Sequence, residues 1–210
     1  MNNSFIVDYG GNTDGDDDLP PSVTEVDSDS NSMAQMKDFN KTIHELYEQF
    51  SCLLKRKKLA NQLNDPVSVQ ELIIEAERLS IVEKAPFYIA KCLFTDQIVK
   101  EIGVYRMLLY PFCTKNTARQ RSLLDGIEAI INENEEVQEK LLNTEGISRM
   151  FYELYQKDIV SEEVFYHWYE QESTKLIDGS VATKIRNCAK KFIEWLRTAE
   201  EGSDQDDDRS

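Results

Sequence analysis

The sequence contains little of the chemistry on which enzymes and metal centres depend. It has only two histidines, His44 and His167, and neither lies beside a GxSxG, HExxH, P-loop or dinucleotide-binding motif. The four cysteines are far apart, in apolar surroundings and without CxxC spacing, and we interpret all of them as reduced, buried thiols: Cys52, Cys92, Cys113 and Cys188. We therefore expect a protein that is not an enzyme and that binds no metal or cofactor.

Long hydrophobic runs are also absent. No stretch reaches the roughly eighteen consecutive apolar residues that a membrane-spanning helix requires, and no basic segment followed by an apolar run begins the chain. Alternating apolar and polar residues bounded by Asn-Gly or Gly-Gly turns, the pattern typical of hairpins, do not stand out either. We expect a soluble, cytoplasmic protein that makes no membrane contact and contains no sheet.

Positive charge is scarce. The chain has 39 acidic and 24 basic residues, a formal net charge of −15. Residues 1–36 carry −8 and residues 200–210 carry −5, which leaves only −2 for the residues between them. Because proteins bind nucleic acids mainly through Lys and Arg at the phosphates, we expect no direct nucleic-acid contact. Residues 1–36 are also rich in Asp, Ser, Asn and Gly and bury too little apolar surface to fold, so we predict a disordered acidic tail there, a helical domain over 37–201 and a second acidic tail over 202–210.

The body of the chain shows helical periodicity. From Phe39 to Leu54, apolar residues recur at steps of three and four, which places them along one face of a helix. Asp65 followed by Pro66 favours the start of a second helix, with Asp as the N-cap and Pro at the first helical position. Similar patterns predict further helices over residues 84–94, 96–112, 117–132, 135–142, 147–156, 162–171 and 181–199. Short turns between these consecutive helices predict an all-α bundle or a helical-repeat stack.

Aromatic and acidic residues interleave over Tyr152–Glu170, YELYQKDIVSEEVFYHWYE. Ser161 is a candidate N-cap, which would place Glu162 and Glu163 in the first helical turn, where the helix dipole favours negative charge. That local role is the alternative to a binding role for both glutamates. Trp168 shares one helical face with two other apolar residues, so we predict that it is part of the core.

A second aromatic and acidic cluster lies near the end of the chain, over Phe192–Glu201, FIEWLRTAEE. Glu200 and Glu201 would stand at the C-terminus of the last helix, where negative charge opposes the dipole. Folding gives no reason for this arrangement. It favours a binding role for the two glutamates.

These motifs resemble a known domain family. LYQKDIVSEE with Trp168, and FIEWLRTAEE with Trp195, are similar to the two acidic-aromatic boxes of the double-tryptophan domain at the C-termini of eukaryotic translation initiation factor 5 and the initiation factor 2B epsilon subunit. Residues 75–113, EAERLSIVEKAPFYIAKCLFTDQIVKEIGVYRMLLYPFC, resemble factor 5 more than the epsilon subunit. The resemblance covers residues 40–201 and also extends to the factor-5-mimic proteins. It implies an atypical HEAT-like stack of antiparallel helix pairs.

The resemblance also implies partners. The first is the lysine-rich tail of the initiation factor 2 beta subunit, with contacts at Asp158, Glu162, Glu163, Glu200 and Glu201, while Trp168 and Trp195 would have a structural, packing role. Initiation factors 1 and 3 are further implied partners. Candidate residues for a second partner surface are basic and lie away from the boxes, with a solvated helix face as the leading alternative: Lys184, Arg186, Lys190 and Lys191.

Two parts of the related proteins have no counterpart here. Full-length factor 5 has a GTPase-activating domain with a catalytic arginine and a zinc ribbon, whereas residues 1–36 contain neither Arg nor Cys. The catalytic-type domains of the epsilon subunit are also missing. We therefore expect neither stimulation of GTP hydrolysis nor nucleotide exchange, but a binding module that tunes preinitiation complex assembly through competition with full-length factor 5. The alternative is an acidic helical adaptor that scaffolds another assembly without contacting initiation factor 2.

Overall fold

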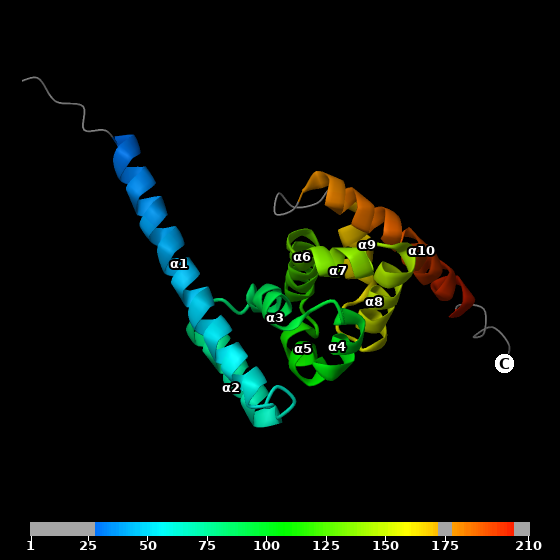
Figure 1. Cartoon of the computed structure of the whole chain (residues 1–210), viewed down its shortest axis with the longest axis horizontal. Coiled ribbons are helices and arrows are strands. Elements are labelled where there is room, and N and C mark those ends of the chain that lie inside the picture. Colours follow the sequence, from blue (N-terminus) through cyan, green and yellow to red (C-terminus); the bar gives the residue numbers. More distant parts are fainter. Residues whose placement is uncertain (1–27, 172–177, 204–210) are drawn as a thin grey trace, which may run out of the picture. The chain divides into compact units, whose positions relative to one another are not determined.

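The computed structural model describes residues 28–171 and 178–203, with backbone alone for 28–41 and 200–203. Every regular element in this part of the chain is a helix, so the all-α prediction is confirmed (Figure 1). The helices are α1 (Ser28–Leu59), α2 (Pro66–Arg78), α3 (Ala85–Leu93), α4 (Ile98–Val104), α5 (Arg106–Cys113), α6 (Thr117–Glu133), α7 (Glu135–Leu141), α8 (Thr144–Gln156), α9 (Glu162–Glu170) and α10 (Gly179–Ser203).

The chain divides into two units, Met1–Phe39 and Asn40–Ser210. The first unit contributes the beginning of α1, which starts at Ser28. The sequence predicted disorder over residues 1–36, and this expectation is corrected for residues 28–36, which are helical. Residues 1–27 and most of the second acidic tail lie outside the described residues.

Asn and Asp side chains cap the starts of several helices. Asp65 accepts a hydrogen bond from the Ser68 N–H at 2.9 Å and Pro66 is the first residue of α2, as the sequence predicted. Asn116, Asn134 and Asn143 cap α6, α7 and α8 in the same way. These caps allow turns of only a few residues, so consecutive helices change direction within a short length of chain.

The predicted helix over residues 96–112 is instead two helices. Tyr105 leaves the helical conformation, with φ −97° and ψ 16°, and separates α4 from α5. Its N–H bonds to the carbonyls of Glu101 and Gly103 and closes the first helix. Ile102 before the break and Leu108 after it are both fully buried, so the bend lets both short helices pack on the core.

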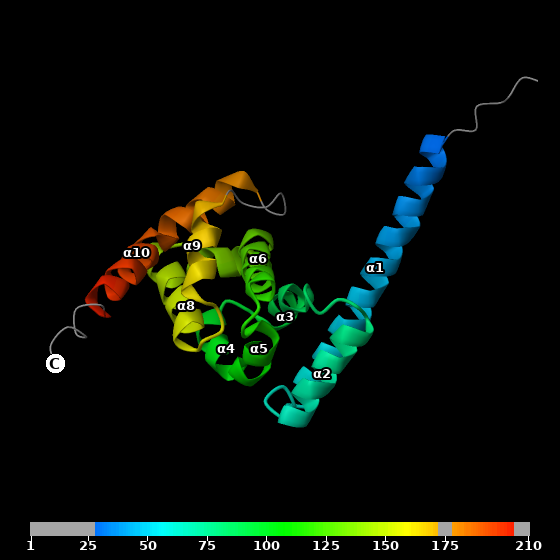
Figure 2. The same cartoon turned by 180° about the vertical axis from the view of Figure 1, so that it is seen from behind.

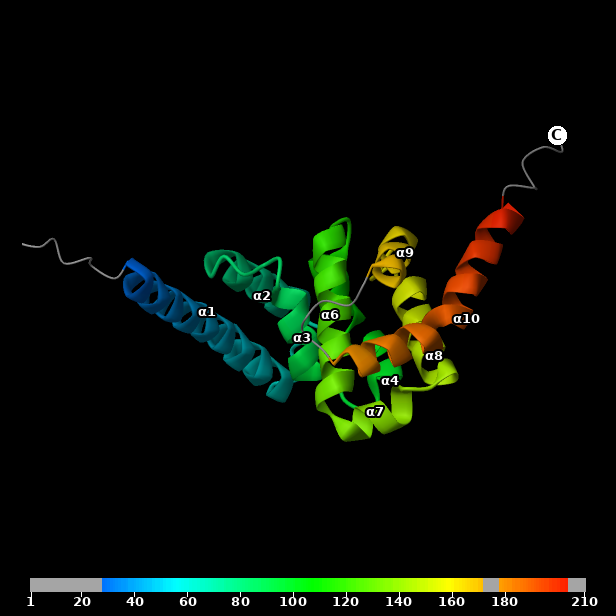
Figure 3. The same ribbon diagram turned by 90° about the horizontal axis from the view of Figure 1, so that it is seen from above.

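The core of the second unit lies between helices that are distant in sequence. The most extensive packing is between α3 and α6 and between α8 and α10. Seen from above, α6 lies between α3 and α9 (Figure 3), and the view from behind agrees (Figure 2). Gly126 makes this close approach possible, because a Cβ there would lie 2.7 Å from the Phe87 carbonyl oxygen on α3.

Aromatic rings join α8, α9 and α10 into one cluster. Phe151 contacts Trp168 edge to face, with ring centroids 4.9 Å apart, and Phe165 contacts Phe192 at the same centroid distance. All four side chains are almost completely buried. Both acidic-aromatic motifs therefore belong to the same packed region of the domain.

The close approach of α3 and α6 predicts opposite effects of one substitution at two glycines. Gly126→Ala should lower the free energy of unfolding by about 1–3 kcal/mol, because the new methyl group meets backbone atoms that have no room to move. Gly103→Ala, where a Cβ meets nothing within 4 Å, should raise it by roughly 0.5–1 kcal/mol through better helix propensity. Urea unfolding of both variants measures the difference, and equal effects would contradict this packing.

Candidate functional site

The turn between α8 and α9 presents three carboxylates to one open cavity. Asp158 is exposed and adopts a left-handed conformation with φ 56°, while the next residue, Ile159, is fully buried and anchors the turn. Asp158, Glu162 and Glu163 line a cavity of about 490 Å³. Lys115 is the one Lys or Arg among the described residues that line it, so the lining is net negative. The structure thus brings together the three carboxylates predicted for the first box.

The three carboxylates differ in their local contacts. Glu162 Oε1 accepts a hydrogen bond from the Tyr166 hydroxyl at 2.8 Å, and Glu163 lies 3.9 Å from His167 Nε2. Within the described part of the chain, no Lys or Arg forms an ion pair with any of the three. Their negative charge is therefore available to a partner at this surface.

A buried glutamine, which the sequence analysis did not identify, holds the start of α9. Ser161 has the extended backbone of an N-cap, but its side chain makes no capping hydrogen bond. Its N–H and its hydroxyl both donate to Gln120 Oε1, each at 2.9 Å, while Gln120 Nε2 donates to the Cys113 carbonyl. The capping prediction for Ser161 is corrected in this respect. Gln120 fixes the turn that carries the acidic residues.

Contacts between α9 and α10 join the two acidic-aromatic motifs. Arg197 Nη2 lies 3.9 Å from Glu170 Oε1, and the Arg197 guanidinium stands over the Tyr166 ring at 5.8 Å. Glu200 and Glu201 belong to the backbone of α10, but their side chains lie outside the described residues. Their contribution to the site stays a prediction.

The two tryptophans occupy different environments. Trp168 is fully buried and its Nε1 donates to Glu128 Oε1 at 3.1 Å. Trp195 is 40% exposed and so less deeply buried than Trp168, and the packing role expected for it stays a prediction. Its ring contacts Tyr152 and Tyr155 of α8 edge to face. The most deeply buried side of α10 is formed by other residues, such as Phe192 and Leu196.

The four basic residues predicted as a second partner surface are not all exposed. Lys184, Lys190 and Lys191 are exposed on α10. Arg186 differs, because its side chain is only 15% exposed, and this prediction is corrected. Its guanidinium lies 4.9 Å from the Trp168 ring and 3.4 Å from Glu128 Oε1, so the side chain packs against core residues.

Glu128 is the buried acid that this arginine accompanies. Burial raises the pKa of its carboxyl group, while the positive charges of Arg186 and Arg121 act in the opposite direction. The burial of Glu128 could not be predicted from the sequence, because an acid on a helix is usually exposed. Only the residues that face Glu128 in the folded protein reveal that its side chain is buried.

The cysteines do not form a site. Cys113 is fully buried, and burial raises its pKa to about 12. Cys92 and Cys188 are partly buried and Cys52 is exposed, so the prediction that all four are buried is corrected. Among the described residues, no group of His, Cys, Asp or Glu is arranged to hold a metal ion, and no helix is long and apolar enough to cross a membrane.

The contrast between the tryptophans predicts different losses of stability. Trp168→Ala should lower the free energy of unfolding by about 3–5 kcal/mol, because it opens a cavity in the aromatic cluster and removes the donor to Glu128. Trp195→Ala should lower it by about 1–2 kcal/mol, because the ring is already partly in water. Denaturant unfolding measures both losses. Equal losses would show that Trp195 is as important to the core as Trp168.

Comparisons with known proteins agree with this architecture. Residues 119–206 match the family model W2: eIF4-gamma/eIF5/eIF2-epsilon. Eukaryotic translation initiation factor 5 from Drosophila melanogaster is 34% identical over 179 residues, which is 85% of this chain and 38% of that protein. The same factor from Mus musculus is 30% identical over 85% of this chain and 40% of that protein. The chain thus spans about two fifths of the length of these relatives.

A mimic protein and a solved structure extend the comparison. The eIF5-mimic protein 2-A from Danio rerio is 27% identical over 119 residues, 55% of this chain and 25% of that protein. The solved C-terminal domain of translation initiation factor 5 at low pH matches with a TM-score of 0.61 and 24% identity, over 78% of this chain and 97% of that one, and supports the fold. Residues 119–206 of this chain are therefore similar to the W2 domain family of eIF4-gamma, eIF5 and eIF2-epsilon, and the chain as a whole is similar in sequence to translation initiation factor 5.

Proposed function

We propose that this protein is a binding module of translation initiation that acts in the cytoplasm. It docks on initiation factor 2 through the lysine-rich tail of the beta subunit and regulates assembly of the preinitiation complex, in competition with full-length factor 5. The observation that supports this most is the cavity lined by Asp158, Glu162 and Glu163, whose carboxylates have no Lys or Arg ion-pair partner in the described part of the chain. Relatives of the chain are translation initiation factors.

The chemistry of the cavity suits lysine. A lysine side chain carries a compact charge on a flexible apolar stem, so it can reach a carboxylate while the stem lies against an aromatic ring. Tyr155 lines the same cavity and offers such a ring beside Asp158 and Glu162. Several lysines in one segment would engage several carboxylates, and opposite charges would also speed the encounter.

Contacts with initiation factors 1 and 3 are a second part of the proposal. Lys184, Lys190 and Lys191 are exposed on α10 and are available to an acidic partner. Lys190 already lies 3.7 Å from Glu194, which leaves the other two as the stronger candidates. An adaptor that ignores initiation factor 2 is the competing explanation, and binding of the lysine-rich tail separates the two.

Reversal of the acidic pair tests the proposed site. Glu162→Lys with Glu163→Lys should weaken binding of a lysine-rich peptide roughly tenfold, because two attractive charges become repulsive. The matched control is Glu135→Lys with Glu136→Lys, an adjacent exposed pair in the first turn of α7. Fluorescence anisotropy at low and physiological salt measures both affinities, and the wild-type affinity should fall as salt rises.

Two outcomes of this assay would decide against the site. Equal weakening by both double variants would mean that the peptide senses only net charge, and binding independent of salt would contradict an electrostatic contact. Reversal of Glu200 and Glu201 to Lys in the same assay tests the second box. Lysine suits a helix C-terminus, so a loss of binding there would not come from unfolding.

A further inference from the structure

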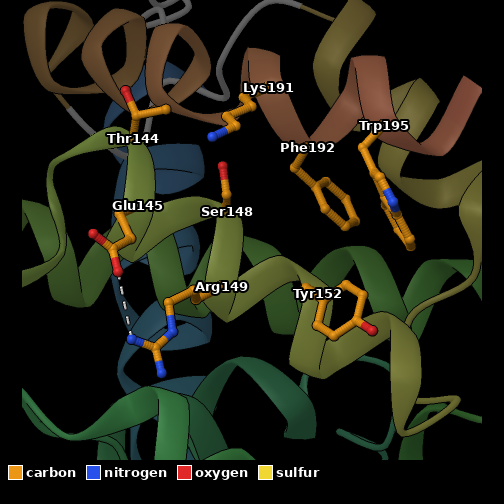
Figure 4. A pocket seen from close by; sticks show the side chains of 8 residues that line it. All are labelled: Thr144, Glu145, Ser148, Arg149, Tyr152, Lys191, Phe192 and Trp195. Carbon is orange, nitrogen blue, oxygen red and sulfur yellow. Dashed lines mark ion pairs between the residues drawn. The ribbon is translucent and has the colours of Figure 1, made fainter. Parts of the chain in front are cut away.

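A second hollow on the domain lies between α8 and α10 (Figure 4). Its volume is about 600 Å³. The hollow is lined by residues of α8, from its first turn onward, and of α10: Thr144, Glu145, Ser148, Arg149, Tyr152, Lys191, Phe192 and Trp195. We call it the α8–α10 groove. It shares no lining residue with the acidic cavity of the proposed function.

One end of the groove is aromatic. Trp195 is 40% exposed and Tyr152 is 37% exposed, and their ring centroids are 5.2 Å apart in an edge-to-face contact. Figure 4 shows these rings together with Phe192 at one side of the hollow. Partly exposed Trp and Tyr side chains over a packed ring are typical of sites that receive an apolar anchor from a partner.

The other end of the groove is polar and favours negative charge. Lys191 reaches down from α10 toward Ser148 (Figure 4), and it forms no ion pair among the residues that the structure describes. The Ser148 hydroxyl is buried and has no hydrogen-bond partner among the described residues. Arg149 lies 3.6 Å from Glu145, and these two charges balance each other. The charge of Lys191 therefore leaves the lining with one net positive charge. This end also holds the first turn of α8, where the helix dipole is positive.

We propose that the α8–α10 groove binds an acidic peptide segment that carries a large apolar side chain. The apolar side chain packs against Trp195 and Tyr152, and a carboxylate of the same segment pairs with Lys191. A lysine-rich segment does not suit this groove, because Lys191 and the α8 dipole repel it. The domain would then hold two segments of opposite charge at separate sites, one in the acidic cavity and one here.

A dye-labelled peptide of four aspartates around one central phenylalanine is the probe. Fluorescence anisotropy with the full chain should show binding, and a peptide with serine in place of phenylalanine should bind about tenfold more weakly or worse, because an aromatic anchor is lost. Similar binding of the two peptides would overturn the proposal, because the groove would then recognise charge alone. A third peptide, with lysine in place of every aspartate, should not compete for the groove.

Two charge reversals, one in the groove and one away from it, locate the binding. Lys191→Glu should weaken the phenylalanine peptide roughly fivefold, since it removes an attraction and adds a repulsion. Lys55→Glu, the matched control, makes the same change at an exposed residue of α1 that does not line the groove, and it should have little effect. Equal effects of the two variants would place the peptide elsewhere. Because Lys191 is exposed, both variants should keep the wild-type unfolding midpoint, which is checked in parallel.

Discussion

A buried carboxylate controls how the C-terminal half of this domain packs. Glu128 of α6 is 2% exposed, accepts from the Trp168 indole of α9 and pairs with Arg186 of α10. Burial of a charge is unfavourable unless hydrogen bonds and an opposite charge accompany it, so these three helices have few alternative arrangements. Glu128 Oε2 and Arg186 Nε have no hydrogen-bond partner among the described residues, which suggests that the pair contributes more to a single arrangement than to net stability.

The arrangement of α9 and α10 in turn positions both proposed surfaces. With Trp168 fixed to Glu128, the start of α9 presents Glu162 and Glu163 at the acidic cavity. The same packing places Trp195 of α10 against α8, where its ring contacts Tyr155, which lines the acidic cavity, and Tyr152, which lines the groove. The acidic cavity and the α8–α10 groove are thus neighbours that depend on one core.

Local signals in the sequence predicted some of this structure well. Asp65 and Pro66 mark a helix start because capping depends only on adjacent residues, and the apolar spacing around Trp168 identifies a buried helical face. The family resemblance gave both tryptophans a packing role without showing how deeply each is buried, and Trp195 is 40% exposed because a helix can bury one face fully and another only partly. Arg186 looked like a surface residue because nothing in its neighbourhood along the chain reveals Glu128, 58 positions away.

Longer-range contacts explain the other differences. The hydrogen bonds between Ser161 and Gln120 join residues 41 positions apart, so a pattern within one helix could not predict them. The break at Tyr105 depends on which side of each short helix meets the core. The family resemblance identified the acidic residues, whereas only the structure showed that Asp158, Glu162 and Glu163 share a cavity.

A double-mutant cycle on Glu128 and Arg186 measures whether this buried pair couples α6 to α10. The free energy of unfolding is measured for Glu128→Gln, Arg186→Met and the double variant. Each single change leaves a buried polar group without its partner, and Arg186→Met should lower the free energy of unfolding by about 3–5 kcal/mol. The double variant should lose less than the sum of the single losses, with a coupling of about 1–3 kcal/mol. Additive losses would show that the pair does not connect α6 to α10 and would contradict this account.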